Sequence, residues 1–200
     1  MSTARKFATW EDLLDIPDGL KAEVVGGVVC MSPSPRPVHG FACAALAARI
    51  FSRFGSTGTG ADGGDQAGWW ILPEVDVRLT RYDIVRPDVS GWRRSRMPKL
   101  PTDVPVDVVP DWVCEVLSPS TEARDRGVKM PLYAAAGIPH AWLVSPDLRL
   151  VEGYELLNGR WTVLGVWADG AVVEVAPFGG LLLDVSGLFP PLDRPVEPAA

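Results

Sequence analysis

The sequence predicts an α/β protein of the α+β kind, in which helices flank a mixed central sheet and extra β-hairpins follow at the C-terminal end. Three observations predict this fold class. Short β-rich runs alternate with two longer helical patterns between residues 9 and 146. A series of hairpin turn signals begins after residue 148. The hydrophobic fraction of 47% and the charged fraction of 22% are typical of a globular chain with a packed core.

The N-terminal segment predicts a short helix and then a pair of strands. Thr9 is placed to cap a helix over 10–16, and Asp12 follows three residues later. The run AEVVGGVVCMS, residues 22–32, has two β-rich halves around Gly26 and Gly27. This pattern predicts either a tight hairpin or a bulged strand pair.

A long helix is expected over 38–54, because apolar residues recur there at helical spacing: Phe41, Ala45, Ala48 and Phe51. Gly55 follows as a stop signal. The Gly-rich stretch 55–68 contains no lysine and no GK[ST] ending. It is therefore interpreted as a flexible connector and not as a phosphate-binding P-loop.

The second half of the chain predicts further strands around one more helix. The expected elements are strands over 69–80 and 82–92, a long loop over 93–107, a strand from residue 111 that Pro119 stops, a helix over 120–137 and a strand over 140–146. Asn158-Gly159 and Asp169-Gly170 are strong turn signals and predict that the stretch 148–177 is a run of hairpins. A last short strand and a Pro-rich tail complete the chain.

The length and the cysteine count limit the class of protein. Two hundred residues suit one domain, which we place at 7–190, with disordered tails at 1–6 and 191–200. No apolar run reaches the roughly 18 to 20 residues of a membrane span, and the N-terminus lacks the apolar core of a signal peptide. The three cysteines show no CxxC spacing, so neither a zinc site nor a disulfide framework is indicated. A cytoplasmic protein without membrane contact is expected.

The charge balance restricts the nucleic-acid partners that the chain could have. The net charge is -6 and the isoelectric point is about 4.9. These values argue against a protein that coats nucleic acid non-specifically. They remain compatible with a metal-dependent nuclease, whose site is itself built from carboxylates, provided that the DNA-binding surface is local.

Two acids stand among apolar residues on neighbouring predicted strands, and they are the first candidate site. Glu115 lies within a run that reads as buried, where an ionised carboxylate costs several kcal/mol unless it is compensated. If its strand lies beside the strand of Asp88, the two carboxylates converge and repel each other, which favours a divalent cation such as Mg²⁺ or Mn²⁺. Taken singly, Asp88 could instead be satisfied by backbone donors, and Glu115 by a buried salt bridge with an arginine.

A helical face supplies the next candidates. Asp125, Lys129 and Tyr133 are spaced at i, i+4 and i+8 and therefore share one side of the predicted helix. If this helix packs over the sheet, Lys129 could reach the carboxylate pair. The alternative is a solvent-exposed Asp125–Lys129 pair worth a few tenths of a kcal/mol. Pro131 disfavours a regular helix at this point, so it decides where Lys129 points.

Two further features could contribute to a site. A basic loop follows the Asp88 strand and would lie beside the site, where it could grip a phosphate backbone: Arg93, Arg94, Arg96 and Lys99. A solvated polar loop is the alternative interpretation. His39 opens the predicted long helix and could reach the site, or it could be a capping or surface histidine.

The ordered set of these motifs resembles a bacterial restriction endonuclease-like family within the PD-(D/E)XK nuclease superfamily. The matching pieces are RPDVS, EVLSPST, DxxxK with a following tyrosine, AGIPHAWLVSPD, and the N-terminal segment AEVVGGVVCMSPSPRPVHG. The resemblance covers roughly residues 7 to 188. It implies a restriction-endonuclease-like core, Mg²⁺-dependent hydrolysis of DNA phosphodiesters with Mn²⁺ as a substitute, and a homo-oligomer, most simply a dimer.

The resemblance also implies roles for particular residues. Asp88 and Glu115 match the two acids of the motif, and Glu23 matches an N-terminal acid that would complete the metal shell. The superfamily's lysine lies two residues beyond the glutamate, where this chain has Leu117, so Lys129 becomes the candidate catalytic amine. Asp125, Tyr133 and His39 would support the site from behind these groups.

The sequence leaves three functions open. The first is a metal-dependent DNA endonuclease. The second is a catalytically silent homo-oligomeric module on the same fold that binds nucleic acid or a protein, which the acidic isoelectric point and the displaced lysine favour. The third is a hydrolase that acts on another phosphate ester.

Overall fold

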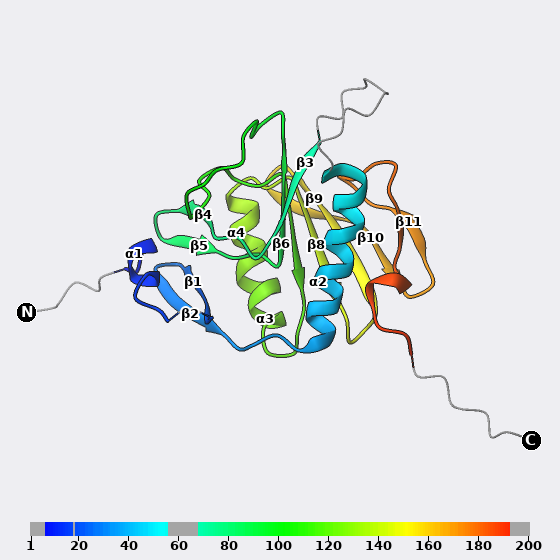
Figure 1. Cartoon of the computed structure of the whole chain (residues 1–200), viewed down its shortest axis with the longest axis horizontal. Coiled ribbons are helices and arrows are strands. Elements are labelled where there is room, and N and C mark those ends of the chain that lie inside the picture. The colour runs from blue at the N-terminus through cyan, green and yellow to red at the C-terminus, as the bar shows by residue number, and fades with distance from the viewer. Residues whose placement is uncertain (1–6, 18, 56–67, 193–200) are drawn as a thin grey trace, which may run out of the picture.

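A computed structural model describes residues 7–17, 19–55 and 68–192 of the chain (Figure 1). Its helical elements are α1 (Trp10–Leu13), α2 (Pro37–Ile50), the π-helical turn η1 (Phe51–Gly55), α3 (Glu122–Arg124), the π-helical turn η2 (Asp125–Lys129), α4 (Met130–Ala135) and the 3₁₀ turn η3 (Ser186–Leu188). Its strands are β1 (Lys21–Val25), β2 (Val28–Ser32), β3 (Trp69–Pro73), β4 (Val77–Thr80), β5 (Asp83–Val85), β6 (Val89–Arg93), β7 (Trp112–Val116), β8 (His140–Ser145), β9 (Leu150–Leu157), β10 (Arg160–Ala168), β11 (Val172–Glu174) and β12 (Leu182–Asp184).

A mixed six-stranded sheet is the centre of the fold, which confirms the predicted class. Its strand order is β10-β9-β8-β7-β6-β3, and β7 and β8 run parallel while their outer neighbours β6 and β9 are antiparallel to them. A four-stranded sheet with the order β2-β1-β5-β4 carries the N-terminal hairpin, and β11 pairs with β12. Figure 1 shows the N-terminal hairpin and the C-terminal strands at opposite ends of the molecule.

Strand β7 lies between two hydrophobic cores, so both of its faces are buried. Trp112, Cys114 and Val116 belong to the core that includes α2, whereas Val113 belongs to the core that includes α4. A strand that is covered on both faces reads as a continuous apolar run, which is the pattern seen here. Because side chains alternate along a strand, Glu115 points to the α4 side together with Val113.

The two predicted strands before β7 are each divided between the two sheets, so the prediction of two long strands was wrong. The run 69–80 forms β3 and β4, and the break falls at Glu74, which has a left-handed φ of 49°. The run 82–92 forms β5 and β6, and the break falls at Pro87, which lacks the N–H that a ladder requires. Asp88 consequently lies where the chain crosses from one sheet to the other.

The long helix is present, but its buried face differs from the one expected. The residues that face the core are Ala42, Leu46 and Ile50, while Phe41 and Phe51 are 44% and 54% exposed. The helix carries apolar residues on almost every side, so spacing alone did not distinguish the faces. The last turn, η1, is π-helical and ends at Gly55.

The second helix forms as three consecutive pieces, α3, η2 and α4, and this arrangement accommodates Pro131. Pro131 has no N–H to donate and its ring would clash with the carbonyl of a regular preceding turn. The wider π-helical turn η2 ends at Lys129, two residues before Pro131. Lys129 is therefore held on a π turn and faces inward, 1% exposed.

The hairpin predictions are confirmed at two places and wrong at a third. β1 and β2 form a tight hairpin, with Gly26 and Gly27 at φ 58° and 73°. β9 and β10 form another, in which Asn158 and Gly159 have positive φ as a type I′ turn requires. The turn at Gly170 does not return the chain to β10, because β11 pairs with β12.

Some predictions concern residues that the structure does not describe. The terminal tails fall outside the described residues except for 191 and 192, and so does the Gly-rich connector at 56–67. Among the described residues, no helix combines the length and the apolar character that a membrane span requires.

Candidate active site

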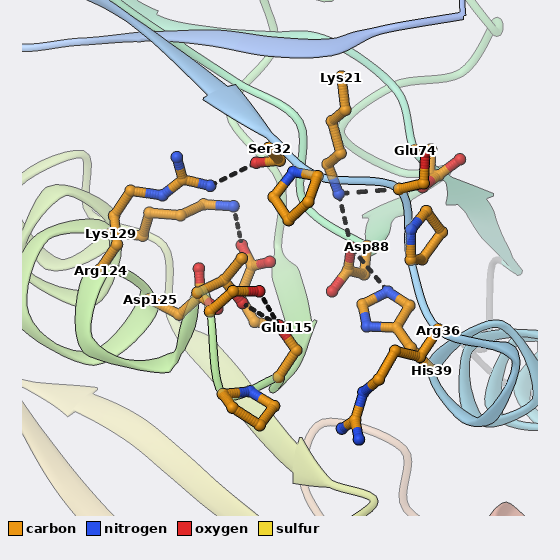
Figure 2. A pocket seen from close by; sticks show the side chains of 17 residues that line it. Lys21, Ser32, Arg36, His39, Glu74, Asp88, Glu115, Arg124, Asp125 and Lys129 are labelled. Atoms are coloured by element: carbon orange, nitrogen blue, oxygen red, sulfur yellow. Dashed lines mark hydrogen bonds and ion pairs between the residues drawn. The ribbon is translucent and has the colours of Figure 1, made fainter.

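A pocket of about 220 Å³ lies at the end of β7, where α2, η2 and the N-terminal hairpin meet (Figure 2). Five of the eleven site residues that the sequence singled out line it, together with a loop rich in serine and proline. Its lining residues are Lys21, Ser32, Pro33, Ser34, Pro35, Arg36, His39, Glu74, Asp88, Glu115, Ser118, Pro119, Ser120, Thr121, Arg124, Asp125 and Lys129.

Asp88 directly precedes β6 and is 3% exposed. The backbone N–H of Val116 donates to Oδ2 at 2.8 Å, Lys21 Nζ donates to Oδ1 at 2.6 Å, and His39 Nε2 lies 3.4 Å from the same oxygen. Burial alone would raise the pKa of Asp88, but His39 and the charge of Lys21 outweigh burial and hold this pKa below its usual value. Asp88 is therefore an ionised carboxylate at neutral pH.

Glu115 lies beside Asp88 in the sheet. Val89 pairs with Cys114 across β6 and β7, so the next position along this register places Asp88 opposite Glu115. Glu115 Oε1 accepts hydrogen bonds from Lys129 Nζ at 2.7 Å and from the Tyr133 hydroxyl. Burial and then the charge of Asp88 raise the pKa of Glu115 to about 7, although Lys129 opposes the change.

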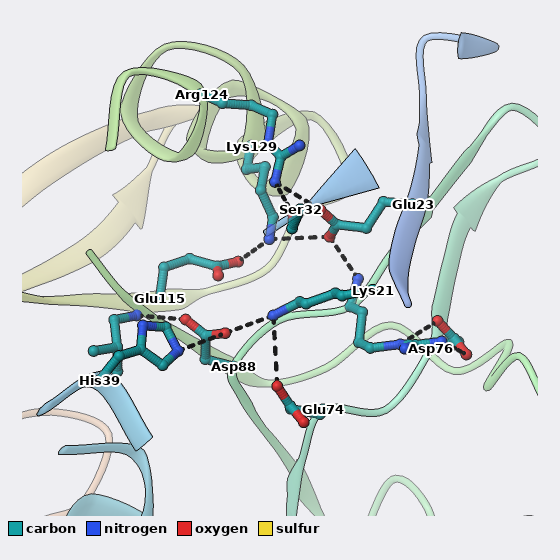
Figure 3. A network of polar contacts seen from close by, with 12 residues as sticks. Lys21, Glu23, Ser32, His39, Glu74, Asp76, Asp88, Glu115, Arg124 and Lys129 are labelled. Atoms are coloured by element: carbon teal, nitrogen blue, oxygen red, sulfur yellow. Dashed lines mark hydrogen bonds and ion pairs between the residues drawn. The ribbon is translucent and has the colours of Figure 1, made fainter. Parts of the chain in front are cut away.

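Lys129 joins two buried carboxylates. Its Nζ lies 2.7 Å from Glu115 Oε1 and 3.0 Å from Glu23 Oε1 (Figure 3). Burial would lower the pKa of Lys129, but the charges of Glu115 and Glu23 outweigh burial and raise it. Lys129 is therefore a protonated amine, and the structure brings it to Glu115 in spite of Pro131.

Glu23 comes from β1 and is fully buried. Its Oε1 accepts the backbone N–H of Arg86 at 2.7 Å in addition to Lys129, and Arg124 Nη2 lies 3.4 Å from Oε2. Burial opposes ionisation, but Lys129 and the Arg86 N–H lower the pKa of Glu23. Within the described residues, Oε2 has no hydrogen-bond partner, which leaves a buried oxygen able to accept one more donor or a cation.

The residues predicted to support the site are all in it. Tyr133 is fully buried and donates its hydroxyl proton to Glu115. Asp125 is 3% exposed; burial raises its pKa, and its charge in turn raises the pKa of Lys129. His39, in the first turn of α2, contacts Asp88 and lines the pocket. The role of each in a reaction stays a prediction.

Three cations of the pocket were not predicted. Lys21 ion-pairs with Asp88, Arg124 donates to Ser32 Oγ at 2.6 Å, and Arg36 pairs with the exposed Asp147 at 2.7 Å. Lys21 could have been found from the sequence, because it lies two residues before Glu23 on the same strand face. Arg36 follows a Pro-rich loop with no periodicity, so nothing in its local pattern indicates the pocket.

The basic loop does not lie beside the site, contrary to the expectation. It follows the far end of β6, whose five residues span about 16 Å from the Asp88 end. Its cations have partners there: Arg96 pairs with Asp111 at 2.9 Å, and Arg93 and Arg94 lie over Trp69 and Trp70. The reason is that an extended strand carries the residues that follow it away from those that precede it. DNA contact by this loop, including the exposed Lys99, stays a prediction.

The carboxylates present in the pocket fit a hard divalent cation. Within the described residues, the side-chain contacts of Glu115 all use Oε1, which leaves Oε2 for a cation. Glu23 does not line the pocket; its buried Oε2 has no hydrogen bond among the described residues, although Arg124 Nη2 lies 3.4 Å from it. Oxygen donors with room for water are the surroundings that Mg²⁺ and Mn²⁺ prefer. Asp88 is less readily available as a metal ligand, because Lys21 already donates a hydrogen bond to its Oδ1.

Comparison with known proteins identifies the fold and the family. The chain is similar in structure to a crystal structure titled as a putative nuclease belonging to DUF820 from Anabaena variabilis ATCC 29413, with a TM-score of 0.71 and 22% sequence identity. The match covers 90% of this chain and 97% of that one, which establishes a shared fold. A search among curated proteins finds no match. The Uma2 family model, described as "Putative restriction endonuclease", matches residues 10–186, and the chain therefore belongs to that family.

Proposed function

We propose that the protein is a Mg²⁺-dependent endonuclease that hydrolyses DNA phosphodiester bonds. The observation that carries the proposal is the juxtaposition of Asp88, Glu115 and Lys129 at one open pocket. Two buried carboxylates from adjacent strands and a buried amine are the groups that metal-assisted hydrolysis of a phosphate ester requires. Membership of a restriction endonuclease-like family and the shared nuclease fold support it.

Asp88 and Glu115 would hold the cation, with the backbone carbonyl of Val116 close by and Glu23 as a third ligand. When bound, Mg²⁺ would polarise the scissile phosphate and lower the pKa of a bound water. The protein's own residues hold the carboxylates in place: the Val116 N–H fixes one oxygen of Asp88, and Tyr133 fixes one oxygen of Glu115. These contacts orient both ligands before any substrate arrives.

Lys129 would orient the attacking water and offset the negative charge that develops on the phosphate. Its raised pKa supports a role as a charged donor rather than as a proton acceptor in the resting site. Arg36 and Arg124, which line the same pocket, would contact the neighbouring phosphates of the DNA. The homodimer and the cytoplasmic location stay predictions from the sequence.

A catalytically silent binding module is the second candidate, and one observation favours it. Lys21 Nζ lies 2.6 Å from Asp88, and Lys129 pairs with both Glu115 and Glu23. The negative charges of the site are therefore compensated by lysines without a metal. The two functions differ in whether a divalent cation can displace Lys21.

The direct test is cleavage of supercoiled and single-stranded DNA by the purified protein in Mg²⁺ and in Mn²⁺. We expect cleavage by the unmodified protein, and its loss in Asp88→Ala and Glu115→Ala. Asp107→Ala is the matched control, because Asp107 is an exposed carboxylate outside the pocket that pairs with Arg78 at the surface. Cleavage that survives both pocket substitutions would come from a contaminant and would remove the support for a nuclease.

Replacing Lys21 with methionine is expected to tighten Mg²⁺ binding by about tenfold. A charge-assisted hydrogen bond contributes about 1.5–3 kcal/mol. A cation that binds Asp88 must first displace the hydrogen bond from Lys21 to this carboxylate. Titration calorimetry with Mg²⁺ or Mn²⁺ measures the change, and Lys99→Met, at an exposed lysine outside the pocket, is the control. An unchanged or weaker affinity in Lys21→Met would show that Lys21 does not compete with the metal.

A further inference from the structure

We propose that His39, Cys43 and Asp88 form a three-ligand site for a Zn²⁺-like transition-metal ion. One imidazole nitrogen, one sulfur and one carboxylate oxygen from these residues all lie within 4.8 Å of one another. The three cysteines alone indicated no zinc site, because the ligands come together only in the folded chain.

The geometry follows from one helix face and one strand end. His39 and Cys43 are four positions apart on α2, so their side chains are neighbours on the helix surface. The start of α2 packs where β6 begins, and His39 Nε2 is already 3.4 Å from Asp88 Oδ1. Ligand atoms of a tetrahedral Zn²⁺ ion lie about 3.4–3.7 Å apart, given bonds of about 2.0–2.3 Å. The cluster therefore has to contract by about 1 Å, which side-chain rotation can supply.

The donor types select the class of metal. Thiolate and imidazole ligands suit Zn²⁺ and Co²⁺, whereas Mg²⁺ is held by oxygen donors. His39 and Asp88 line the pocket, and Cys43 is half-buried behind them. Three protein ligands beside an open pocket leave a fourth position for water, as in zinc sites that are not purely structural.

Lys21 has an alternative partner when a metal takes Asp88. Its Nζ lies 2.6 Å from Asp88 Oδ1 and 3.9 Å from Glu74 Oε1. The Glu74 side chain is 55% exposed and the Lys21 side chain 20%, so the amine can shift towards Glu74 and solvent. A transition-metal ion at this place replaces one positive charge by another, and Asp88 remains compensated.

The proposed zinc site shares Asp88 with the proposed nuclease site but does not depend on nuclease activity. An ion held by His39 and Cys43 would engage Asp88, the carboxylate that the proposed Mg²⁺ site shares with Glu115. Zn²⁺ would then oppose Mg²⁺ at the pocket, and binding itself can be measured without DNA.

Titration of the metal-free protein with Co²⁺ tests the site, since Co²⁺ is a spectroscopic substitute for Zn²⁺. We expect a thiolate-to-Co²⁺ charge-transfer band in the near ultraviolet that saturates at one ion per chain and disappears when Zn²⁺ is added. Cys43→Ser should lack the band, and Cys30→Ser should keep it, because Cys30 lies on β2 outside the cluster. His39→Gln should weaken Co²⁺ binding by at least about tenfold, as the loss of even a ligand-orienting partner does.

A second measurement uses the unmodified chain, so it does not depend on the folding of a variant. Zn²⁺ should slow alkylation of Cys43 by iodoacetamide, followed by mass spectrometry, and should leave alkylation of Cys30 unchanged. The proposal is overturned if wild-type protein gives no thiolate band, if the band persists in Cys43→Ser, or if Zn²⁺ protects Cys30 and not Cys43.

Discussion

Replacing Lys129 with methionine is expected to lower the free energy of unfolding by about 3–5 kcal/mol at neutral pH. Lys129 is 1% exposed and compensates two buried carboxylates, Glu115 and Glu23. Breaking a buried ion pair by removing one partner leaves an uncompensated charge in the interior, which is the costly case. Denaturant unfolding monitored by fluorescence or circular dichroism measures the loss, provided that the dependence on denaturant is unchanged.

Two control variants show whether the loss of stability comes from the buried ion pairs of Lys129. Lys99→Met removes an exposed lysine outside the pocket and should change the unfolding free energy by no more than about 0.5 kcal/mol. Glu23→Gln combined with Lys129→Met should recover part of the loss, because one of the two uncompensated charges is removed with the amine. A loss below about 1 kcal/mol in Lys129→Met would contradict the close ion pairs on which the site depends.

The same double variant, Glu23→Gln with Lys129→Met, is expected to reduce Mg²⁺-dependent DNA cleavage by about 10²–10⁴-fold relative to Glu23→Gln alone. Asp88 and Glu115 remain, so the cation can still bind and compensate Glu115. What is lost is the protonated amine 2.7 Å from Glu115, which would orient the water and offset charge on the phosphate. Single-turnover cleavage rates, with Mg²⁺ affinity measured by calorimetry on the same proteins, separate the two contributions.

The outcomes distinguish the residue roles. Cleavage by the double variant at the rate of Glu23→Gln would show that the amine is not needed. A Mg²⁺ affinity that falls only with Lys129→Met would assign Lys129 to holding the carboxylates rather than to the reaction. Glu23→Gln measures the remaining prediction about Glu23: a weakened Mg²⁺ affinity supports its role as a third metal ligand, and an unchanged affinity limits it to anchoring Lys129.

Much of the site could be predicted because its residues follow local periodic patterns. Side-chain alternation placed Glu115 on one strand face, and helical spacing placed Lys129 on the same side as Tyr133. Both patterns are retained in the structure, and Lys129 reaches Glu115. The missing information was the behaviour of Pro131, because a π-helical turn is a response to packing and has no short sequence signature.

Other features depended on contacts between segments that are far apart in the chain. Lys21 and Asp88 are 67 residues apart in sequence and meet because β1 joins the sheet of β5. His39 and Cys43 approach Asp88 because the Ala42 face of α2 packs on the core and turns them towards the start of β6. The apolar pattern of α2 did not reveal this orientation.

The mixed sheet between helices, most of the helices and strands along the chain, and the candidate residues Asp88, Glu115 and Lys129 follow from the sequence, because periodicity and turn residues are local properties. Tertiary structure decided which charges compensate which. It paired Lys21 with Asp88, and it brought Lys129 within ion-pair distance of both Glu115 and Glu23. It also placed the basic loop at the far end of β6. The physical reason is that buried charges take whichever partner the packing of distant segments brings within a few ångströms, and the cost of leaving them unpaired makes that choice specific.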